Sequence, residues 1–263
     1  MSTGCITREV LDAQEQLAEF RYVRKPAVKG YTGEMLRVDL GDLSCRIIPV
    51  TEELKLKFTG GKGFDLWLLW NEVNPNTKWD SPENAICISA GPLGGSPAFP
   101  GSGKSIVTTI SPTTGSVIDS NVGGHFGPLL KFAGFDALCV TGRRETRDHM
   151  VMIDGATGAV RFYRNPELET NSHILAGQLS EMLTDNQEDR RNFSSVSAGT
   201  GSDHTWIGCL NFSFWDWRRN HMRLKQAGRG GCGTVLRGKG LKALAVRAPR
   251  SRPEWRRAEG GGE

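Results

Sequence analysis

The stretch Asp119-Ser-Asn-Val-Gly-Gly-His-Phe-Gly-Pro-Leu-Leu-Lys-Phe-Ala-Gly-Phe-Asp-Ala-Leu-Cys-Val-Thr141 carries the local signals on which the fold assignment depends. Glycines lie at positions 123, 124 and 127, and such clusters are typical of turns with positive φ or of backbone that approaches a ligand closely. Residues Gly127–Ala133 predict a short helix, and the apolar run Ala137–Thr141 predicts a strand. A glycine loop, a short helix and a strand therefore follow one another, without the regular strand–helix alternation of a doubly wound fold.

Strands predominate in the rest of the chain. Apolar and polar residues alternate in Glu34–Leu40, which is the pattern of a strand with one buried face. Helices are expected at Thr7–Phe20, at Gly63–Val73, and from an N-cap at Ser172. Further strands are expected at residues 43–50, 85–89, 105–110, 150–153, 159–163, 193–197, 206–212 and 242–246. The sequence therefore predicts a β-rich α+β domain.

The composition excludes several classes of protein. The chain has 263 residues, of which 38% are hydrophobic and 24% charged, as in a globular protein with a sizeable core. The net charge is only +4, and five arginines lie in the last seventeen residues, so nucleic acid is not an expected partner. No apolar run approaches the ~20 residues of a membrane span, and Met1–Glu19 carries charges where a signal peptide is apolar. A cytoplasmic protein without a membrane partner is expected.

The cysteines and histidines give no catalytic or metal-binding signature of their own. Six cysteines are spread along the chain, and no two have the CxxC spacing of an autonomous zinc or iron–sulfur site. Most lie in apolar runs, as Cys87 and Cys139 do, so buried reduced thiols are expected. His125 is interpreted as an ordinary turn residue rather than a catalytic one.

Two short motifs imitate nucleotide-binding loops. Residues Ala98–Ser105 nearly match GxxxxGK[ST], but the first glycine is an alanine, and the β-branched Ser105–Ile110 predicts a strand where a phosphate loop needs a helix. Residues Gly228–Gly233 match GxGxxG, but Leu224–Ala227 does not predict a buried strand, and no acidic residue follows about 20 positions later. A P-loop ATPase remains a distant alternative, and a dinucleotide site is not favoured.

Several further blocks occur in a specific order along the chain. They are Phe58-Thr-Gly-Gly-Lys-Gly63, Ser81-Pro-Glu-Asn84 with Ser89-Ala-Gly-Pro-Leu-Gly-Gly95, Pro100-Gly-Ser-Gly-Lys104, Ser111-Pro-Thr-Thr-Gly115, Asp119–Gly127, Leu130–Ala137, and Gln226-Ala-Gly-Arg-Gly-Gly231 with Gly240–Val246. In this order and spacing the blocks resemble the N-terminal domain of the aldehyde:ferredoxin oxidoreductases, the tungsten–pterin enzymes. The resemblance covers about residues 30–248, and so many blocks in register make it highly specific.

The resemblance implies a β-rich α+β domain with two sheets at residues 30–248. A lead-in at residues 1–29 and a disordered tail at residues 249–263 would flank this domain. The domain would form the base on which a tungsten bis-pterin cofactor lies. In this family the pterins hold the metal through dithiolene sulfurs, and Mg²⁺ bridges the pterin phosphates.

The resemblance also assigns roles by position. Asn121 and Gln226 would each give a backbone carbonyl to Mg²⁺, and no residue of this chain is assigned a catalytic role. Lys104 and Lys225 lie where the best-known members have arginines, and lysines would offset phosphate charge as point donors. For Arg229 an equal alternative is a structural role, in which it binds backbone carbonyls. The candidate cofactor-binding residues are Lys104, Asn121, Gly123, Lys225, Gln226 and Arg229.

Full-length members of the family continue into two largely helical domains, which supply the ligands of a 4Fe–4S cluster and the acid/base residues. This chain has no CxxCxxxC group, so the resemblance implies a partner chain or the rest of the enzyme. The assembled enzyme would oxidise an aldehyde to a carboxylate and pass two electrons to ferredoxin. The tungsten subunit of a benzoyl-CoA reductase is an alternative in the same family. A non-catalytic cofactor-holding module is an alternative of another class.

Overall fold

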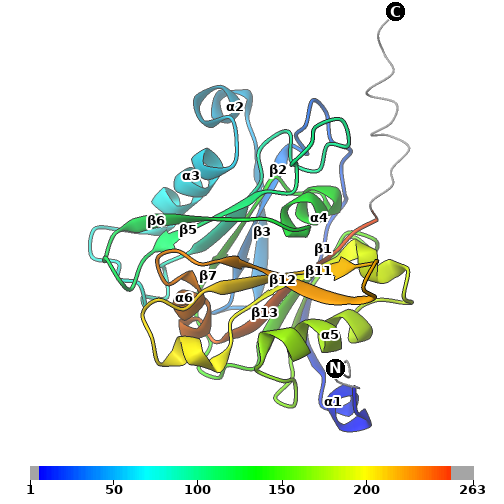
Figure 1. The fold of residues 1–263 in the computed structure, drawn as a ribbon. Coiled ribbons are helices and arrows are strands. Elements are labelled where there is room, and N and C mark those ends of the chain that lie inside the picture. Colours follow the sequence, from blue (N-terminus) through cyan, green and yellow to red (C-terminus); the bar gives the residue numbers. More distant parts are fainter. Residues whose placement is uncertain (1–5, 250–263) are drawn as a thin grey trace, which may run out of the picture.

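Two β-sheets form the framework of the molecule (Figure 1). The computed structural model describes residues 6–249, so positions 250–263 of the predicted tail lie outside the described residues. The seven-stranded sheet has the order β1-β9-β8-β13-β10-β11-β12, and only β13 and β8 are parallel in it. Its strands are β1 (Glu15–Arg21), β8 (His149–Asp154), β9 (Ala159–Arg164), β10 (Phe193–Ser197), β11 (Leu210–Asp216), β12 (His221–Ala227) and β13 (Leu241–Arg247).

The six-stranded sheet has the order β3-β2-β7-β4-β5-β6, and only β2 and β7 are parallel in it. Both β4 and β7 are buried along their whole length, which explains why their sequences are continuous apolar runs. The strands are β2 (Glu34–Asp39), β3 (Ser44–Pro49), β4 (Ile86–Ser89), β5 (Ser105–Ile110), β6 (Val117–Val122) and β7 (Ala137–Thr141).

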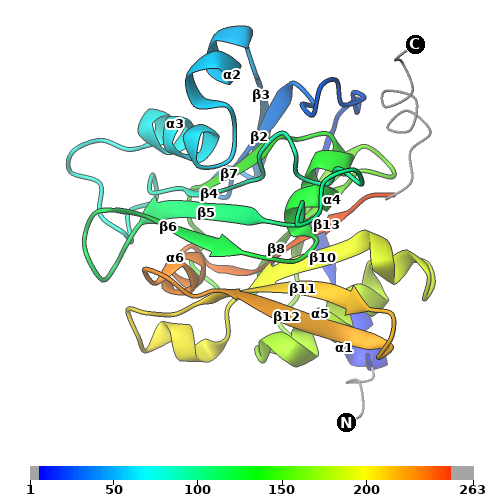
Figure 2. The same ribbon diagram turned by 45° about the horizontal axis from the view of Figure 1, so that its top comes forward.

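Helices fill the space between the sheets and cover their outer faces. Between the sheets lie α4 (Phe126–Ala133), which contacts β7 on one side and β10 on the other, and α6 (Cys232–Gly238) (Figure 2). On the outer face of the six-stranded sheet, α3 (Lys62–Glu72) packs against β4 and β5 and against α2 (Glu52–Phe58). The outer face of the seven-stranded sheet is covered by α1 (Arg8–Asp12) and α5 (Ser172–Met182). Two short 3₁₀ helices are η1 (Asp189–Asn192) and η2 (Thr200–Asp203).

The hydrophobic core between the sheets combines both halves of the chain. Leu36 and Ile88 from the six-stranded sheet share this core with Val151 and Phe212 from the seven-stranded sheet. A second apolar cluster lies under α3, and a third lies under α1 and α5. The predicted β-rich α+β architecture with two sheets is therefore confirmed.

Three predicted strands have the predicted bounds, namely β5, β7 and β10. The helix predicted at Thr7–Phe20 is wrong, because the helix ends at Asp12 and β1 follows it. The backbone of β1 pairs with β9, and Phe20 packs against the central core, so tertiary contacts override the weak helical pattern.

Other boundaries also differ from the sequence prediction. The strand predicted at residues 206–212 begins at Leu210 and continues to Asp216. Asn171, rather than Ser172, caps α5, because the Asn171 side chain accepts a hydrogen bond from the His173 amide. Besides β1, the sequence prediction missed the helices α2 and α6, the strands β6 and β12, and both 3₁₀ helices.

Candidate functional site

The edge strands of the two sheets meet at one place. Strand β6 ends the six-stranded sheet, β12 ends the seven-stranded sheet, and the two strands contact each other. The turn after β12 is fixed on β6, since the Arg229 amide donates a hydrogen bond of 3.0 Å to Ser120 Oγ. A Cβ at Gly230 would lie 2.5 Å from Ile118 Cγ1, and the φ of Gly230 is +67°, so only glycine permits this approach. Asn121 and Gln226 lie on these two strands.

Beside this junction lies a cavity of about 580 Å³, here called the glycine-loop cavity. The loop before β5 forms one wall, and this loop is packed so tightly on its neighbour that a Cβ at Gly103 would lie 2.7 Å from Gly124 O. The start of α4 and the β11–β12 hairpin form the other walls. The lining residues are Gly95, Ser96, Pro97, Gly101, Ser102, Gly103, Gly124, His125, Pro128, Leu129, Phe132, Phe214 and Lys225.

One of the six predicted site residues lines this cavity, and three others, Lys104, Gly123 and Gln226, directly adjoin lining residues in the chain. Lys225 lines the cavity, and Lys104 directly precedes Ser105, which pairs with Val122 across β5 and β6. Gly123 follows Val122, so it continues β6 toward the cavity. Gln226 is exposed, and its side-chain amide donates to Asn211 Oδ1 at 3.3 Å.

Three cations at this site have no partner among residues 6–249. The side chains of Lys104, Lys225 and Arg229 are exposed and make no hydrogen bond or ion pair with any residue that the structure describes. Lys62 is different, because it forms an ion pair of 2.7 Å with Asp119 on β6. The carbonyl-binding role considered for Arg229 is therefore not observed within the described part of the chain. Unpaired cations beside a cavity favour binding of an anion.

At two positions of the site, Gly123 and Gly228, the structure would accommodate a side chain. A Cβ at Gly123 or at Gly228 would meet no atom within 4 Å, and neither residue has a φ in the left-handed region. Neither packing within the chain nor backbone conformation therefore requires glycine here. Open space directly above the backbone fits a flat group or a phosphate that approaches the main chain closely.

A buried lysine on α4, Lys131, binds backbone carbonyls of two other segments of the chain. Lys131 Nζ donates hydrogen bonds to Gly30 O at 2.8 Å and to Gly91 O at 2.6 Å, and it lies 3.9 Å from Asp136 Oδ1. Burial lowers the pKa of Lys131 to about 8. Asp136 in turn accepts hydrogen bonds from the backbone amides of Thr32 and Gly33. The sequence analysis missed this pair, although a lysine within the apolar run of α4 is a signal that could have indicated it.

His125 was interpreted as an ordinary turn residue, and the structure places it in the wall of the glycine-loop cavity. It occupies the N-cap position of α4, and its ring centroid lies 5.6 Å from that of Phe214 in an edge-on contact. The glycines on either side of position 125 were the available signal for this location.

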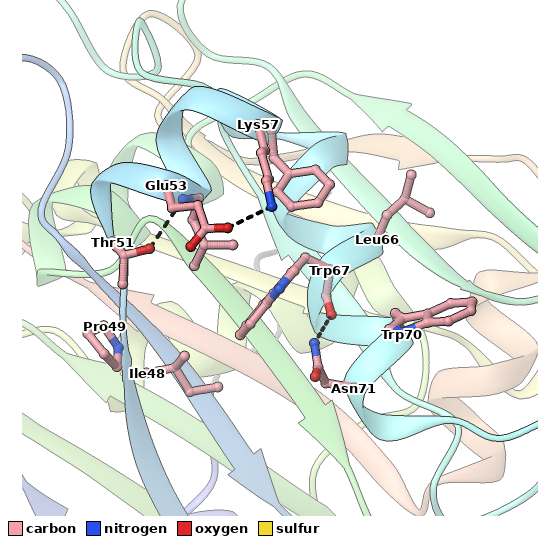
Figure 3. A pocket seen from close by; sticks show the side chains of 11 residues that line it. Ile48, Pro49, Thr51, Glu53, Lys57, Leu66, Trp67, Trp70 and Asn71 are labelled. Atoms are coloured by element: carbon pink, nitrogen blue, oxygen red, sulfur yellow. Dashed lines mark hydrogen bonds and ion pairs between the residues drawn. The ribbon is translucent and has the colours of Figure 1, made fainter.

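A cavity larger than the glycine-loop cavity lies between β3, α2 and α3 and has a volume of about 820 Å³ (Figure 3). Its polar side chains are already bonded within the chain: Thr51 caps α2, Lys57 pairs with Glu53, and Asn71 donates to the Trp67 carbonyl. The lining is otherwise apolar and includes Trp67 and Trp70. None of the predicted cofactor-binding residues lines this cavity.

Neither of the two segments that match nucleotide-binding motifs has the geometry of a nucleotide-binding loop. Ser105 begins strand β5, so the GxxxxGK[ST]-like segment lacks the helix of a phosphate loop. The GxGxxG segment follows strand β12 and leads into helix α6, but β12 is mostly exposed or half-buried, so the segment does not follow a buried strand, as expected. In addition, the following strand β13 pairs with β8 and β10 rather than with β12, so no βαβ unit forms. Two of the segment's glycines serve internal packing, since a Cβ at Gly231 would lie 2.0 Å from Trp206 O and a Cβ at Gly233 would lie 2.2 Å from Cys209 O.

Comparison with known proteins identifies the family of the chain. The family model of the aldehyde ferredoxin oxidoreductase N-terminal domain matches residues 35–248. The chain belongs to this family. The tungsten-containing aldehyde ferredoxin oxidoreductase of Pyrococcus furiosus is 33% identical over 228 residues, which is 85% of this chain and 34% of that protein. The corresponding protein of Pyrococcus horikoshii is 32% identical over 222 residues, which is 83% of this chain and 33% of that protein.

A solved structure has a similar fold. The active-site complex BamBC of benzoyl coenzyme A reductase, in complex with 1,5-dienoyl-CoA, is similar with a TM-score of 0.70 and 28% identity. The match covers 83% of this chain and 31% of that chain. This aldehyde ferredoxin oxidoreductase N-terminal domain thus spans about a third of the length of its relatives, which are oxidoreductases.

The matched region includes all six predicted site residues. Within residues 6–249 the domain has no group of three or more His, Cys, Asp or Glu side chains that could hold a metal ion. None of the helices in that same range is long and apolar enough to cross a membrane.

Proposed function

We propose that this chain is the cofactor-binding N-terminal domain of an aldehyde ferredoxin oxidoreductase-type enzyme, and that a tungsten bis-pterin cofactor lies over the glycine-loop cavity and the adjoining edge strands. The supporting observation is the junction of β6 and β12. It brings Asn121 and Gln226, which are far apart in the sequence, onto contacting strands next to the unpaired Lys104 and Lys225.

The donor set fits the chemistry of such a cofactor. Lys104, Lys225 and Arg229 would bind the pterin phosphates as cations. The backbone carbonyls of Asn121 and Gln226 would bind the bridging Mg²⁺, since Mg²⁺ prefers oxygen ligands. Gly123 would permit close approach of the pterin, because no side chain covers its backbone. When bound, the cofactor would supply the redox chemistry that converts an aldehyde into a carboxylate.

The other components of the reaction belong to the rest of the enzyme. The match covers only about a third of each relative, so the proposed partner is the remaining part of such an enzyme, in the same or a separate polypeptide. That part would hold the 4Fe–4S cluster and pass electrons to ferredoxin. Within this proposal, residues of this chain bind and orient the cofactor and take no part in proton transfer.

A second candidate function is supported by the similarity to the BamBC complex. In that case the chain would be a fragment of a tungsten subunit of the benzoyl-CoA reductase type, with the same cofactor site and a different substrate. Cofactor bound to the chain without any partner protein would instead support a non-catalytic cofactor-holding module.

The proposal is tested by elemental analysis for tungsten, molybdenum and iron on the chain purified anaerobically from its native host, with any copurifying protein identified. We expect tungsten in the wild type. The double substitution Lys104→Ala/Lys225→Ala is expected to lower tungsten content about tenfold, because two phosphate contacts are lost.

The matched control is Lys57→Ala/Lys78→Ala, which removes two exposed lysines remote from the glycine-loop cavity. Its tungsten content and the thermal stability of both double variants should equal those of the wild type. Equal tungsten content in the Lys104/Lys225 variant would show that the site assignment is wrong. A wild-type chain without tungsten or molybdenum would overturn the proposed function.

A further inference from the structure

The tip of the β11–β12 hairpin carries an exposed cluster of arginines around a tryptophan. This surface, here called the Arg–Trp patch, consists of Trp217, Arg218, Arg219 and Arg223 from the hairpin and Arg191 from η1. Figure 2 shows this hairpin at the edge of the molecule, where β11 and β12 are the last two strands of the seven-stranded sheet. None of these residues lines the glycine-loop cavity, and the proposed cofactor site does not use them.

Trp217 is 60% exposed, although tryptophan is a residue type that is usually buried. Two guanidinium groups stack on its ring: the Arg218 Cζ atom lies 5.1 Å from the ring centroid, and the Arg191 Cζ atom lies 5.9 Å from it. These cation–π contacts hold the guanidinium groups in place without neutralising their charge. Within the described part of the chain, neither Arg191 nor Arg218 has a carboxylate partner.

The remaining two arginines share a single carboxylate. Arg219 and Arg223 both bind Asp216 Oδ2, at 3.0 Å and 3.3 Å. Asp216 is further fixed by the backbone amides of Arg218 and Arg219, which donate to its Oδ1 atom. The patch therefore contains four arginines, of which two share the Asp216 carboxylate, and it keeps an excess of positive charge.

The base of the patch is rigid. Arg190 stacks on the buried Trp215, with its Cζ atom 5.3 Å from the ring centroid, and forms an ion pair of 3.6 Å with Glu181 on α5. The strands β11 and β12 pair in register from Leu210 to Asp216. The exposed arginines are thus presented by an ordered hairpin on an ordered support.

We propose that the Arg–Trp patch is a docking surface for a protein partner that presents clustered carboxylate side chains. Tryptophan and arginine contribute most of the binding energy at the centres of protein interfaces. The planar guanidinium group binds a carboxylate through two parallel hydrogen bonds, and the arginines are already ordered, so less conformational entropy is lost on docking. The excess of positive charge is complementary to an acidic surface and would steer its approach.

The experiment uses the full chain and poly-L-glutamate as the probe, with binding followed by intrinsic tryptophan fluorescence and by calorimetry. The wild type should bind the probe at low salt and release it at high salt. The charge reversal Arg191→Glu/Arg218→Glu should weaken binding about tenfold or more, as for an interface centre. Arg191→Lys/Arg218→Lys keeps the charge but loses the planar group, so its affinity should lie between the two.

The matched control is Arg46→Glu/Arg143→Glu, which changes the net charge equally at two exposed arginines outside the patch. This variant should bind poly-L-glutamate as tightly as the wild type. Equal weakening in both charge-reversed variants would overturn the proposal, since it would show an effect of net charge alone. Stronger, patch-dependent binding to duplex DNA or to vesicles of anionic phospholipid than to poly-L-glutamate would also overturn it, in favour of those ligands.

Discussion

Lys131 and Asp136 form an ion pair that is almost completely excluded from solvent, with each side chain 1% exposed. The pair connects three segments, because Lys131 binds the carbonyls of Gly30 and Gly91 while Asp136 binds the amide of Thr32. Burial raises the pKa of Asp136 and lowers that of Lys131. A buried pair of this kind adds little net stability, but the loss of one partner leaves a charge without compensation.

Lys131→Met keeps the size of the side chain and removes its charge. We expect a decrease of about 3–5 kcal/mol in the free energy of unfolding at pH 7, because Asp136 is left buried and unpaired. Urea unfolding measures this quantity. Asp136→Asn should lower the free energy of unfolding less in the Lys131→Met background than in the wild type. If the two substitutions lowered the free energy of unfolding additively, the two residues would not be coupled.

The pH dependence of the same pair gives a second test. The folded pKa of Lys131 is about 8 and its ordinary value is 10.5, so between these values the unfolded chain binds more protons than the folded chain. The pH-dependent part of the contribution that Lys131 makes to stability is therefore fully present above pH 10.5 and is lost as the pH falls through 8. The difference in unfolding free energy between wild type and Lys131→Met should increase as the pH rises from about 8. A difference that is constant with pH would contradict the lowered pKa.

At the scale of single elements, the start of α5 shows how neighbouring residues divide their roles. Asn171 has an extended backbone, with φ −70° and ψ 116°, as an N-cap residue requires. Ser172, which the sequence analysis expected to be the cap, instead accepts a hydrogen bond of 3.1 Å from the Asn211 side chain on β11. The residue type alone does not distinguish the two positions, because both asparagine and serine are good caps.

Asn171→Ala is expected to lower the free energy of unfolding by about 1 kcal/mol, because the His173 amide loses its partner. Asn171→Asp should retain nearly all of the wild-type stability, since aspartate also caps helices and complements the positive end of the helix dipole. Chemical denaturation of the two variants side by side checks both statements. An alanine variant as stable as the wild type, or an aspartate variant as unstable as alanine, would contradict the cap assignment.

At the scale of the whole molecule, the two sheets depend on one common core. Val107 and Leu138 from one sheet and Val196 and Leu244 from the other belong to the same apolar cluster, and α4 packs between the sheets (Figures 1 and 2). Separation of the sheets would expose this cluster to water, which is the largest single cost that unfolding incurs. Neither sheet is therefore expected to remain folded without the other.

We expect a single cooperative unfolding transition in urea. The midpoints measured by far-UV circular dichroism and by tryptophan fluorescence should coincide, since Trp67 lies on the six-stranded side and Trp215 on the seven-stranded side. Native-state amide exchange should give β7 and β10 the same free energy of opening. Separate midpoints, or exchange from β10 well before β7, would show that the sheets unfold independently.

The strands that lie wholly inside the molecule were predictable from sequence. Buried strands such as β7 and β10 consist of consecutive apolar or small residues, and this local pattern of five residues is enough to predict a strand. The family resemblance likewise rests on local blocks, most of which lie in loops and turns whose glycines are fixed by backbone conformation or close packing. For these parts the physical cause is local, and it is therefore visible in the sequence.

The strands at the edges required the tertiary structure. Strand β12 is polar and mostly exposed, so its sequence lacks the alternation of a half-buried strand, and it forms because its backbone pairs with β11. Strand β1 forms against β9 for the same reason, in place of the predicted helix.

By itself, the sequence determined the fold class, the buried strands and the set of candidate cofactor residues. Only the tertiary structure decided that β6 and β12 meet, that Lys225 lines the glycine-loop cavity beside their junction, and that Lys131 binds the carbonyl of Gly91. Local periodicity reflects interactions between residues that are close in the chain. The site, in contrast, depends on backbone pairing and packing between segments that are far apart in the sequence, such as β6 and β12, and no pattern within one segment specifies its distant partner.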